Sequence, residues 1–119
     1  MRVIDETAVL DRQQLREVTL DDEELMQEVL AALLEDTFKQ MAPLDAAVRG
    51  HDLKTTMRLA HYCKGACANV GANAVATVLK GLEKAAAREQ HQECAASLRI
   101  LAQELEKLRV EVESPGRPS

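Results

Sequence analysis

Apolar residues recur along this chain with the spacing of helices. In the C-terminal third they return at alternating steps of four and three residues, which forms a narrow stripe on one face of a helix. A second stripe lies in the middle of the chain, and a third, broader one near its start. No stretch alternates apolar with polar residues for long, so strands are not predicted. From the C-terminal end, the stripes comprise Cys94, Leu98, Leu101, Leu105, Leu108 and Val112; Val75, Val78, Leu79, Leu82 and Ala86; and Leu25, Met26, Val29, Leu30, Leu33 and Leu34.

Polar and special residues place the ends of the first long helix. Asp21 followed by Glu24 has the pattern of a capping box, which predicts a helix start at this point. Pro43 is expected to kink or end that helix, because a proline ring lacks the amide hydrogen and clashes with the preceding turn. Gly50 then predicts a left-handed stop, and Asp52 is a suitable N-cap for the helix that follows.

The remaining elements complete an all-α fold. Gly71 predicts the end of the next helix and Asn73 the cap of the one after it. Gly81 falls inside a helical pattern, where it either permits a close helix crossing or is tolerated at a cost of roughly 1 kcal/mol relative to alanine. A short helix is predicted over about residues 6–18. Because short connections make successive helices antiparallel neighbours, the sequence predicts an antiparallel four-helix bundle with a short extra N-terminal helix.

Length and composition fit one small domain. We assign residues 1–113 of the 119 to the helical bundle and residues 114–119, SPGRPS, to a disordered tail. A net charge of −5, with one Tyr, one Phe and no Trp, argues against nucleic-acid binding, which relies on basic surfaces and aromatic stacking. The longest apolar run, residues 29–34, is far too short to span a membrane.

The cytoplasm is the expected compartment. Acidic and basic residues interrupt the N-terminus before any apolar segment of a signal peptide forms. The cysteines number three, and an odd number in such a chain predicts reduced thiols instead of a disulfide framework. We also expect the protein to be a monomer.

The segment AHYCKGACANVGA, residues 60–72, places polar and very small residues together on a predicted helix. The apolar side chains of this helix form one face, and His61 lies roughly 140° from the centre of that face. His61 is therefore expected to be exposed, whereas Cys63 and Cys67 are expected to face the core. The residues that share the exposed face with His61 are Arg58, Lys64, Gly65 and Ala68.

An open, cationic approach to an imidazole suits phosphoryl chemistry. A neutral imidazole nitrogen is a competent nucleophile near neutral pH. The ammonium group of Lys64 lies one turn from His61, where it can donate charge-assisted hydrogen bonds to a phosphoryl group. Phosphoryl transfer depends mainly on positioning and charge neutralisation, so few catalytic residues are needed. A lone exposed histidine is most often inert, and the spacing of Lys64, Gly65 and Gly71 is what favours the functional interpretation.

These residues carry a resemblance to a known family. The segment resembles the His-x-x-Lys-Gly motif of histidine-containing phosphotransfer (HPt) domains, with His61, Lys64, Gly65 and the later Gly71 at the matching positions. The stretches LDDEELMQEVLAALLEDTF, AAVRGHDLKTTMRLAH and LKGLEKAAARE also look like the family, so the resemblance covers about residues 8–112. It implies that His61 is phosphorylated, that Lys64 stabilises the phosphoryl group and that Gly65 leaves space for a partner. The docking surface is expected to comprise Arg58, Gly65, Ala68 and Gly71.

The chain departs from the family pattern beside this motif. Cys63 stands where leucine is usual, which keeps the position apolar, and Ala66 replaces a common serine. Glu83 occupies a position where some members carry a glutamine that hydrogen-bonds the active histidine. A glutamate there can orient a protonated imidazole but repels phosphate, so its role stays open.

Other chemistry has weaker support. Cysteine and histidine are zinc ligands, but His61 and Cys63 point to nearly opposite sides of one helix and no Cys-x-x-Cys pair exists, so no metal is expected. A glycine-rich phosphate loop is absent from the sequence, so autonomous ATP-dependent kinase activity is not expected. His51 and His91 fall in predicted turns and are expected to be solvated. The residues considered as metal ligands are His61, Cys63, Cys67, His91 and Cys94.

The leading hypothesis is a phosphorelay carrier. His61 would accept a phosphoryl group from the aspartate of one response-regulator receiver and pass it to another, and the receiver would supply Mg²⁺. One alternative is an adaptor that docks receivers without taking phosphate. Another is the phosphoacceptor domain of a chemotaxis-type kinase, whose donor is a separate ATP-binding domain of a sensor histidine kinase. The intact His61 and Lys64 favour a carrier, and the short length with a plain tail favours a stand-alone protein.

Overall fold

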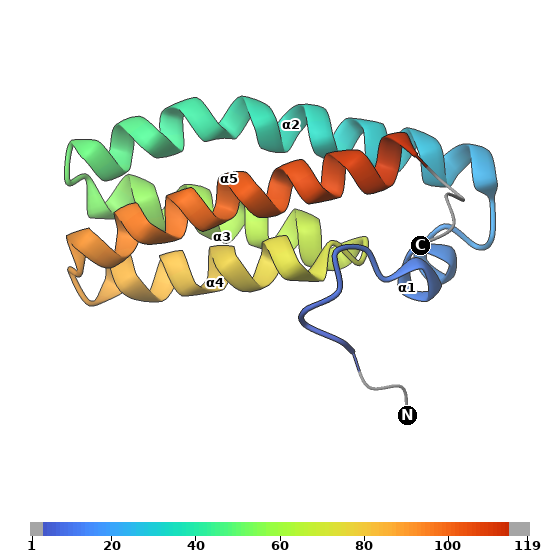
Figure 1. The fold of residues 1–119 in the computed structure, drawn as a ribbon, viewed down its shortest axis with the longest axis horizontal. Helices are drawn as coiled ribbons and strands as arrows, with labels where there is room; N and C mark the ends of the chain where they lie inside the picture. The colour runs from blue at the N-terminus through green and yellow to red at the C-terminus, as the bar shows by residue number, and fades with distance from the viewer. Residues whose placement is uncertain (1–3, 115–119) are drawn as a thin grey trace.

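The computed structural model describes residues 4–114, and within this range the chain forms five helices and no strand (Figure 1). The long helices run antiparallel as a bundle, and the short first helix lies at one end of it. The predicted all-α bundle with a short N-terminal helix is thereby confirmed. Residues 115–119 of the predicted tail lie outside the described residues. The helices are α1 (Arg12–Val18), α2 (Glu23–Arg49), α3 (Leu53–Asn69), α4 (Asn73–Ala87) and α5 (His91–Glu113).

The core consists mainly of leucine and small side chains from all of these helices. Leu15 of α1 and Leu44 of α2 are each 1% exposed, and Leu79 of α4 and Leu105 of α5 are fully buried. The stripes predicted on α4 and α5 face this core, apart from the partly buried Val78 and Val112 that pack against it. Within residues 4–114, none of the helices combines the length and the hydropathy needed to cross a lipid bilayer.

The starts of the first two helices differ from the prediction. Helix α1 begins at Arg12, because the Asp11 side chain accepts a hydrogen bond from the amide of Gln14 and caps it there. The cap of α2 is Asp22, whose carboxylate accepts from the amide of Leu25 at 3.0 Å. Asp21 has φ of 61°, in the left-handed region, and belongs to the turn before the helix. The predicted start at residue 6 and the predicted cap at Asp21 are both wrong.

Pro43, which was expected to kink or end helix α2, lies inside the helix and does not end it. The helix continues to Arg49, and Leu44 and Val48 after the proline are buried in the core. Burial of these side chains offsets the loss of one backbone hydrogen bond. The left-handed residue after α2 is His51 (φ 54°), whereas Gly50 has φ of −83°. A Cβ at Gly50 would lie 3.2 Å from the carbonyl oxygen of Ala46, so close approach of the backbone explains the glycine.

Helix α3 has the predicted cap and the predicted stop. The Asp52 carboxylate accepts from the amide of Thr55 at 3.1 Å. Gly71 follows the helix with φ of +92°, which a glycine adopts without strain. Asn73, however, does not cap α4: it is the first residue of that helix, and its side chain donates to the carbonyl oxygen of Asp5 at 3.1 Å. Gly81 is exposed, and a Cβ there would meet nothing within 4 Å, so it is not a close helix crossing.

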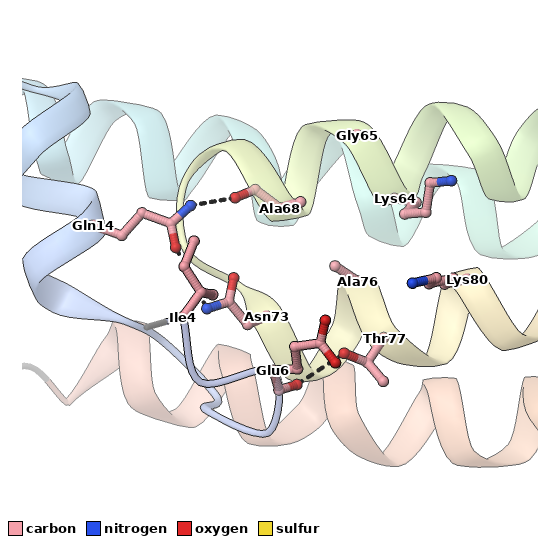
Figure 2. Close-up of a pocket in the computed structure, with 10 residues that line it drawn as sticks. All are labelled: Ile4, Glu6, Gln14, Lys64, Gly65, Ala68, Asn73, Ala76, Thr77 and Lys80. Atoms are coloured by element: carbon pink, nitrogen blue, oxygen red, sulfur yellow. Dashed lines mark hydrogen bonds between the residues drawn. The ribbon is translucent and has the colours of Figure 1, made fainter. Parts of the chain in front are cut away.

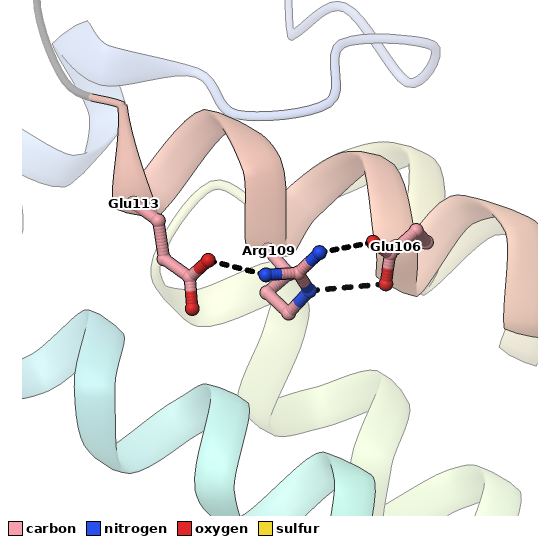
Figure 3. A network of polar contacts seen from close by, with 3 residues as sticks. All are labelled: Glu106, Arg109 and Glu113. Carbon is pink, nitrogen blue, oxygen red and sulfur yellow. Dashed lines mark hydrogen bonds and ion pairs between the residues drawn. The ribbon is translucent and has the colours of Figure 1, made fainter.

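Ion pairs cover the outer face of α5 near its C-terminus. Arg109 pairs with both Glu106 and Glu113 along the helix (Figure 3). The hydrogen bonds from Arg109 lower the pKa of the Glu106 carboxyl. Arg12 of α1 donates to Glu111 at 2.6 Å and so connects the short helix to α5. Because these pairs are largely exposed, each contributes little to stability.

Candidate functional site

His61 lies near the middle of α3, on the face that points away from the core. Its side chain is 69% exposed. Cys63 and Cys67 lie on the opposite face and are 3% and 0% exposed, as the helical spacing predicted. Burial raises the pKa of the Cys63 thiol to about 11 and that of Cys67 to about 12, so both are neutral and poor nucleophiles near neutral pH.

Glu83 of α4 connects His61 with Lys64. One carboxylate oxygen, Oε2, lies 3.0 Å from His61 Nδ1, and the other, Oε1, accepts from Lys64 Nζ at 2.7 Å. The side chains of Lys64 and Glu83 are 28% and 27% exposed, so this pair is partly shielded from water. The hydrogen bond from Lys64 lowers the pKa of the Glu83 carboxyl, and the contact with His61 lowers it further. Glu83 is therefore a carboxylate at neutral pH.

This contact fixes which imidazole nitrogen is free to react. A carboxylate only accepts hydrogen bonds, so Nδ1 of His61 must carry the proton and donate it to Glu83. In the neutral ring the lone pair then lies on Nε2, for which the described residues provide no hydrogen-bond partner. Nε2 is thus the nucleophilic nitrogen of an imidazole whose side chain is largely exposed.

The surface beside His61 is open, as the small residues predicted. Gly65 is exposed, and a Cβ at this position would meet nothing within 4 Å. Ala68 and Arg58 are also exposed, one on each side of His61 along the same face. Gly71 does not belong to this surface: it is buried in the turn after α3, and a Cβ there would lie only 2.7 Å from the carbonyl oxygen of Asp11. Its place in the predicted docking set is therefore corrected to a role in the turn.

A group of cations around His61 was only partly predicted. Lys54 and Arg58 precede His61 by seven and three residues on the exposed face of α3, and Lys64 follows it. From α4, Lys80 and Lys84 flank Glu83 and are exposed. The lysines of α4 were missed because their position beside α3 depends on how the two helices pack, which the spacing within either helix does not specify.

The other candidate residues do not form a site. Among residues 4–114, no three histidine, cysteine, aspartate or glutamate side chains come together as a metal-binding group. His51 and His91, predicted to be solvated separately, instead stack on each other with ring centroids 3.9 Å apart. His51 lies in the turn after α2, and His91 is the first residue of α5.

An antiparallel helical bundle that exposes a histidine, with a carboxylate between it and an ammonium group, fits a class of phosphoryl carriers. The sequence profile of the Hpt domain matches residues 28–111, and the chain belongs to this family. Hpt proteins carry phosphoryl groups in phosphorelays, where they work with receiver domains and kinases.

Solved structures of HPt proteins are similar to this chain. Histidine-containing phosphotransfer protein B from Pseudomonas aeruginosa PAO1 has a TM-score of 0.82 at 26% identity, covering 88% of this chain and 91% of that one. The histidine-containing phosphotransfer protein MtHPt2 from Medicago truncatula has a TM-score of 0.69 at 26% identity, covering 92% of this chain and 85% of that one. Among curated proteins, none matches the chain significantly.

Proposed function

We propose that this protein is a phosphorelay carrier in which His61 accepts a phosphoryl group from the aspartate of one receiver domain and passes it to another. The observation that carries the proposal is the exposed imidazole, with Nδ1 held by Glu83 at 3.0 Å and no hydrogen-bond partner for Nε2 among the described residues. Membership of the Hpt family supports it. A carrier of this kind works in the cytoplasm, and its partners are response-regulator receivers and a sensor histidine kinase.

The chemical step uses Nε2 of His61 as the nucleophile. Its lone pair attacks the phosphorus of the receiver's aspartyl phosphate, an N–P bond forms, and the P–O bond breaks with its electrons returning to the aspartate carboxylate. The proton on Nδ1 stays in place, so the phosphorylated ring carries a formal positive charge. In the onward step a carboxylate of the second receiver attacks the phosphorus, and neutral imidazole leaves. The Mg²⁺ of both steps belongs to the receiver.

Glu83 is a positioning residue in this scheme. It holds the proton on Nδ1 during both steps, which keeps Nε2 nucleophilic before transfer and makes the ring a good leaving group afterwards. It also repels the phosphoryl group, but that group is bound at Nε2 on the other side of the ring. Coulomb energy falls with distance, so the attraction between the carboxylate and the nearby positive ring outweighs this repulsion.

Lys64 has two possible acceptors once His61 is phosphorylated. In the unphosphorylated protein its ammonium group donates to Glu83 at 2.7 Å. Because Lys64 lies one turn after His61 on the same side of α3, a rotation of its flexible side chain brings the ammonium group toward the phosphoryl oxygens. We assign Lys64 to stabilisation of the phosphoryl group, and Gly65, Ala68 and Arg58 to the surface on which the receiver docks.

Direct phosphorylation of the protein tests this proposal. Incubation with a phosphorylated receiver domain should add one phosphoryl group, detected by intact-protein mass spectrometry, and the label should be labile in acid and stable in base. His61→Gln should abolish the label without changing helicity. His51→Gln and His91→Gln are matched controls and should leave it unchanged. Label that persists in His61→Gln would refute the assignment.

The same experiment separates the alternative functions. An adaptor without transfer would bind receivers but gain no mass in any variant. The phosphoacceptor domain of a chemotaxis-type kinase would acquire its label from ATP through a separate ATP-binding domain, and would give it to receivers but not take it from them. Label that moves in both directions between receivers supports the carrier.

A further inference from the structure

The chain before α1 binds along the start of α4. We call residues 4–11 the N-terminal strap. The first turn of α4 has no side-chain cap, and the carbonyl oxygen of Ala8 takes that role by accepting from the amide of Ala74. The strap is held by hydrogen bonds from Ala74 N to Ala8 O (2.8 Å), Asp11 N to Gly71 O (2.8 Å), Thr77 Oγ1 to Glu6 O (2.8 Å) and Asn73 Nδ2 to Asp5 O (3.1 Å).

A groove of about 320 Å³ lies between this strap and the exposed face of α3 (Figure 2). Gly65 and Ala68 line it from α3, and Ile4 lines it from the strap. Lys64 and Lys80 lie toward one end of the groove, and Ile4 lies toward the other. The lining between them combines small apolar residues with polar ones: Gly65, Ala68 and Ala76, and Glu6, Gln14, Asn73 and Thr77. The groove thus offers an apolar contact at Ile4 and two ammonium groups for an acidic group at its other end.

The groove is continuous with the phosphoacceptor site. Lys64 lines the groove and also contacts Glu83, the residue that holds His61. Gly65 lies one helical turn beyond His61 on the same face. A protein that brings an aspartyl phosphate to Nε2 must therefore cover the groove as well.

Charge restricts which partner protein can bind there. The chain has a net charge of −5, so an acidic partner is repelled by the molecule as a whole. The face that carries His61 also holds exposed cations, because Arg58 lies one turn before His61 on α3 and Lys80 lies one turn before Glu83 on α4. A partner with an acidic phosphorylation site and an apolar neighbouring loop matches both features.

We infer that the groove receives the loop of a receiver domain beside its phosphorylated aspartate, and that the N-terminal strap is the second wall of this docking site. The inference rests on the proposed function. It assigns a contact with the partner to Ile4, a residue that lies outside the His-x-x-Lys-Gly motif. Ile4 is 48% exposed, so its apolar surface is available to a partner.

Charge substitutions at Ile4 test the inference in the full-length protein. Ile4→Asp places a carboxylate in the groove, where it faces the acidic site of the receiver. The receiver concentration that gives half-maximal labelling should rise about tenfold or more, with the maximal rate little changed. Ile4→Lys removes the apolar contact but keeps the favourable charge, so its effect should be clearly smaller. Ile100→Asp is the matched control, because Ile100 on α5 is also 48% exposed, and it should behave as the wild type.

Phosphoramidate, a small donor that needs no docking, separates failure of the inference from failure of the proposed function. All three variants should be labelled by phosphoramidate at the wild-type rate, and unchanged helicity shows that they are folded. Receiver-dependent labelling of Ile4→Asp at the wild-type half-maximal concentration would overturn the role of the strap while leaving the carrier intact. An equal rise of the half-maximal receiver concentration in Ile4→Asp and Ile4→Lys would overturn the inference that the partner is acidic at this groove.

A concentration-dependent dimer that is lost in Ile4→Asp would assign the groove to a second copy and overturn the inference. No label on the wild type from either donor would overturn the carrier and the inference together.

Discussion

Replacing Gly65 with glutamine separates a docking surface from an ordinary helix surface. Gly65 lies inside α3, is exposed and has no atom within 4 Å of an added Cβ, so the folded protein accepts a side chain there without strain. Glycine is a poor helix former, and a good one in its place gains roughly 0.5–1 kcal/mol. For a domain of this size, that gain raises the melting temperature by about 2–5 °C.

The same side chain should slow transfer from a receiver. It would project from the turn that follows His61, onto the face the receiver must approach. The reacting atoms have to come within about 3–3.5 Å, and a displacement of about 1 Å costs on the order of 10²-fold in rate. We therefore expect Gly65→Gln to be more stable than the wild type and about 10²-fold slower with a phosphorylated receiver. With phosphoramidate as the donor its rate should be unchanged.

Gly81 provides the matched control. It also lies inside a helix, is exposed and has no atom within 4 Å of an added Cβ. It precedes Glu83 by two residues, which places it about 200° around α4 from the side chain that contacts His61. Gly81→Gln should gain the same stability and transfer at the wild-type rate. Full transfer activity in Gly65→Gln would refute the reasoning, because the receiver would then approach His61 from another direction.

Two further predictions concern Glu83 and the buried thiols. Glu83→Gln keeps an acceptor for Nδ1 but loses the charge, so labelling of His61 should slow about tenfold with either donor, as expected when a charge-assisted hydrogen bond becomes a neutral one. Because the pKa of Glu83 is lowered from its ordinary 4.5, its contribution to stability is present above that value, and thermal unfolding of the wild type and the variant should converge as the pH falls below it. Cys63 and Cys67 have folded-state pKa values of about 11 and about 12, above the ordinary 9.0, so unfolding releases their protons in alkali. Stability should decline above about pH 9 by roughly 1.4 kcal/mol per pH unit for each thiol. A double alanine variant should show a smaller decline in chemical denaturation, and what is left belongs in part to Cys94, because burial raises the pKa of that thiol too. An alkaline slope as steep in the double variant as in the wild type would assign it to other groups.

The local periodicity of α3 was sufficient to predict its exposed and buried faces. His61, Cys63 and Cys67 lie where a spacing of 3.6 residues per turn places them, because amphipathic helices bury their apolar side. Asp52 was also predicted correctly, since a capping aspartate acts on an amide three residues away. These features depend only on neighbours along the chain.

The features that sequence reasoning missed depend on packing between distant segments. Proline lowers helix propensity, but the buried Leu44 and Val48 hold the turn that follows Pro43 in α2. Asparagine is a preferred N-cap residue, yet at α4 a backbone carbonyl of the N-terminal strap takes the place of the Asn73 side chain as the cap. A carbonyl is common to every residue, so this contact leaves no signature in the sequence. The bridge from Glu83 to His61 was an open question for a similar reason, because it crosses from one helix to another.

The uneven distribution of charge orients the protein relative to an acidic partner as the two approach each other. Its net charge is negative, whereas Arg58 lies one turn before His61 on α3, Lys80 lies one turn before Glu83 on α4, and both are exposed. An acidic protein diffusing nearby is repelled from most directions and attracted from one, so the electric field turns the phosphoacceptor toward it before contact. Salt shortens the range of that field to about 10 Å at 0.1 M ionic strength. The frequency of productive collisions therefore depends on ionic strength, even though the chemistry at Nε2 does not.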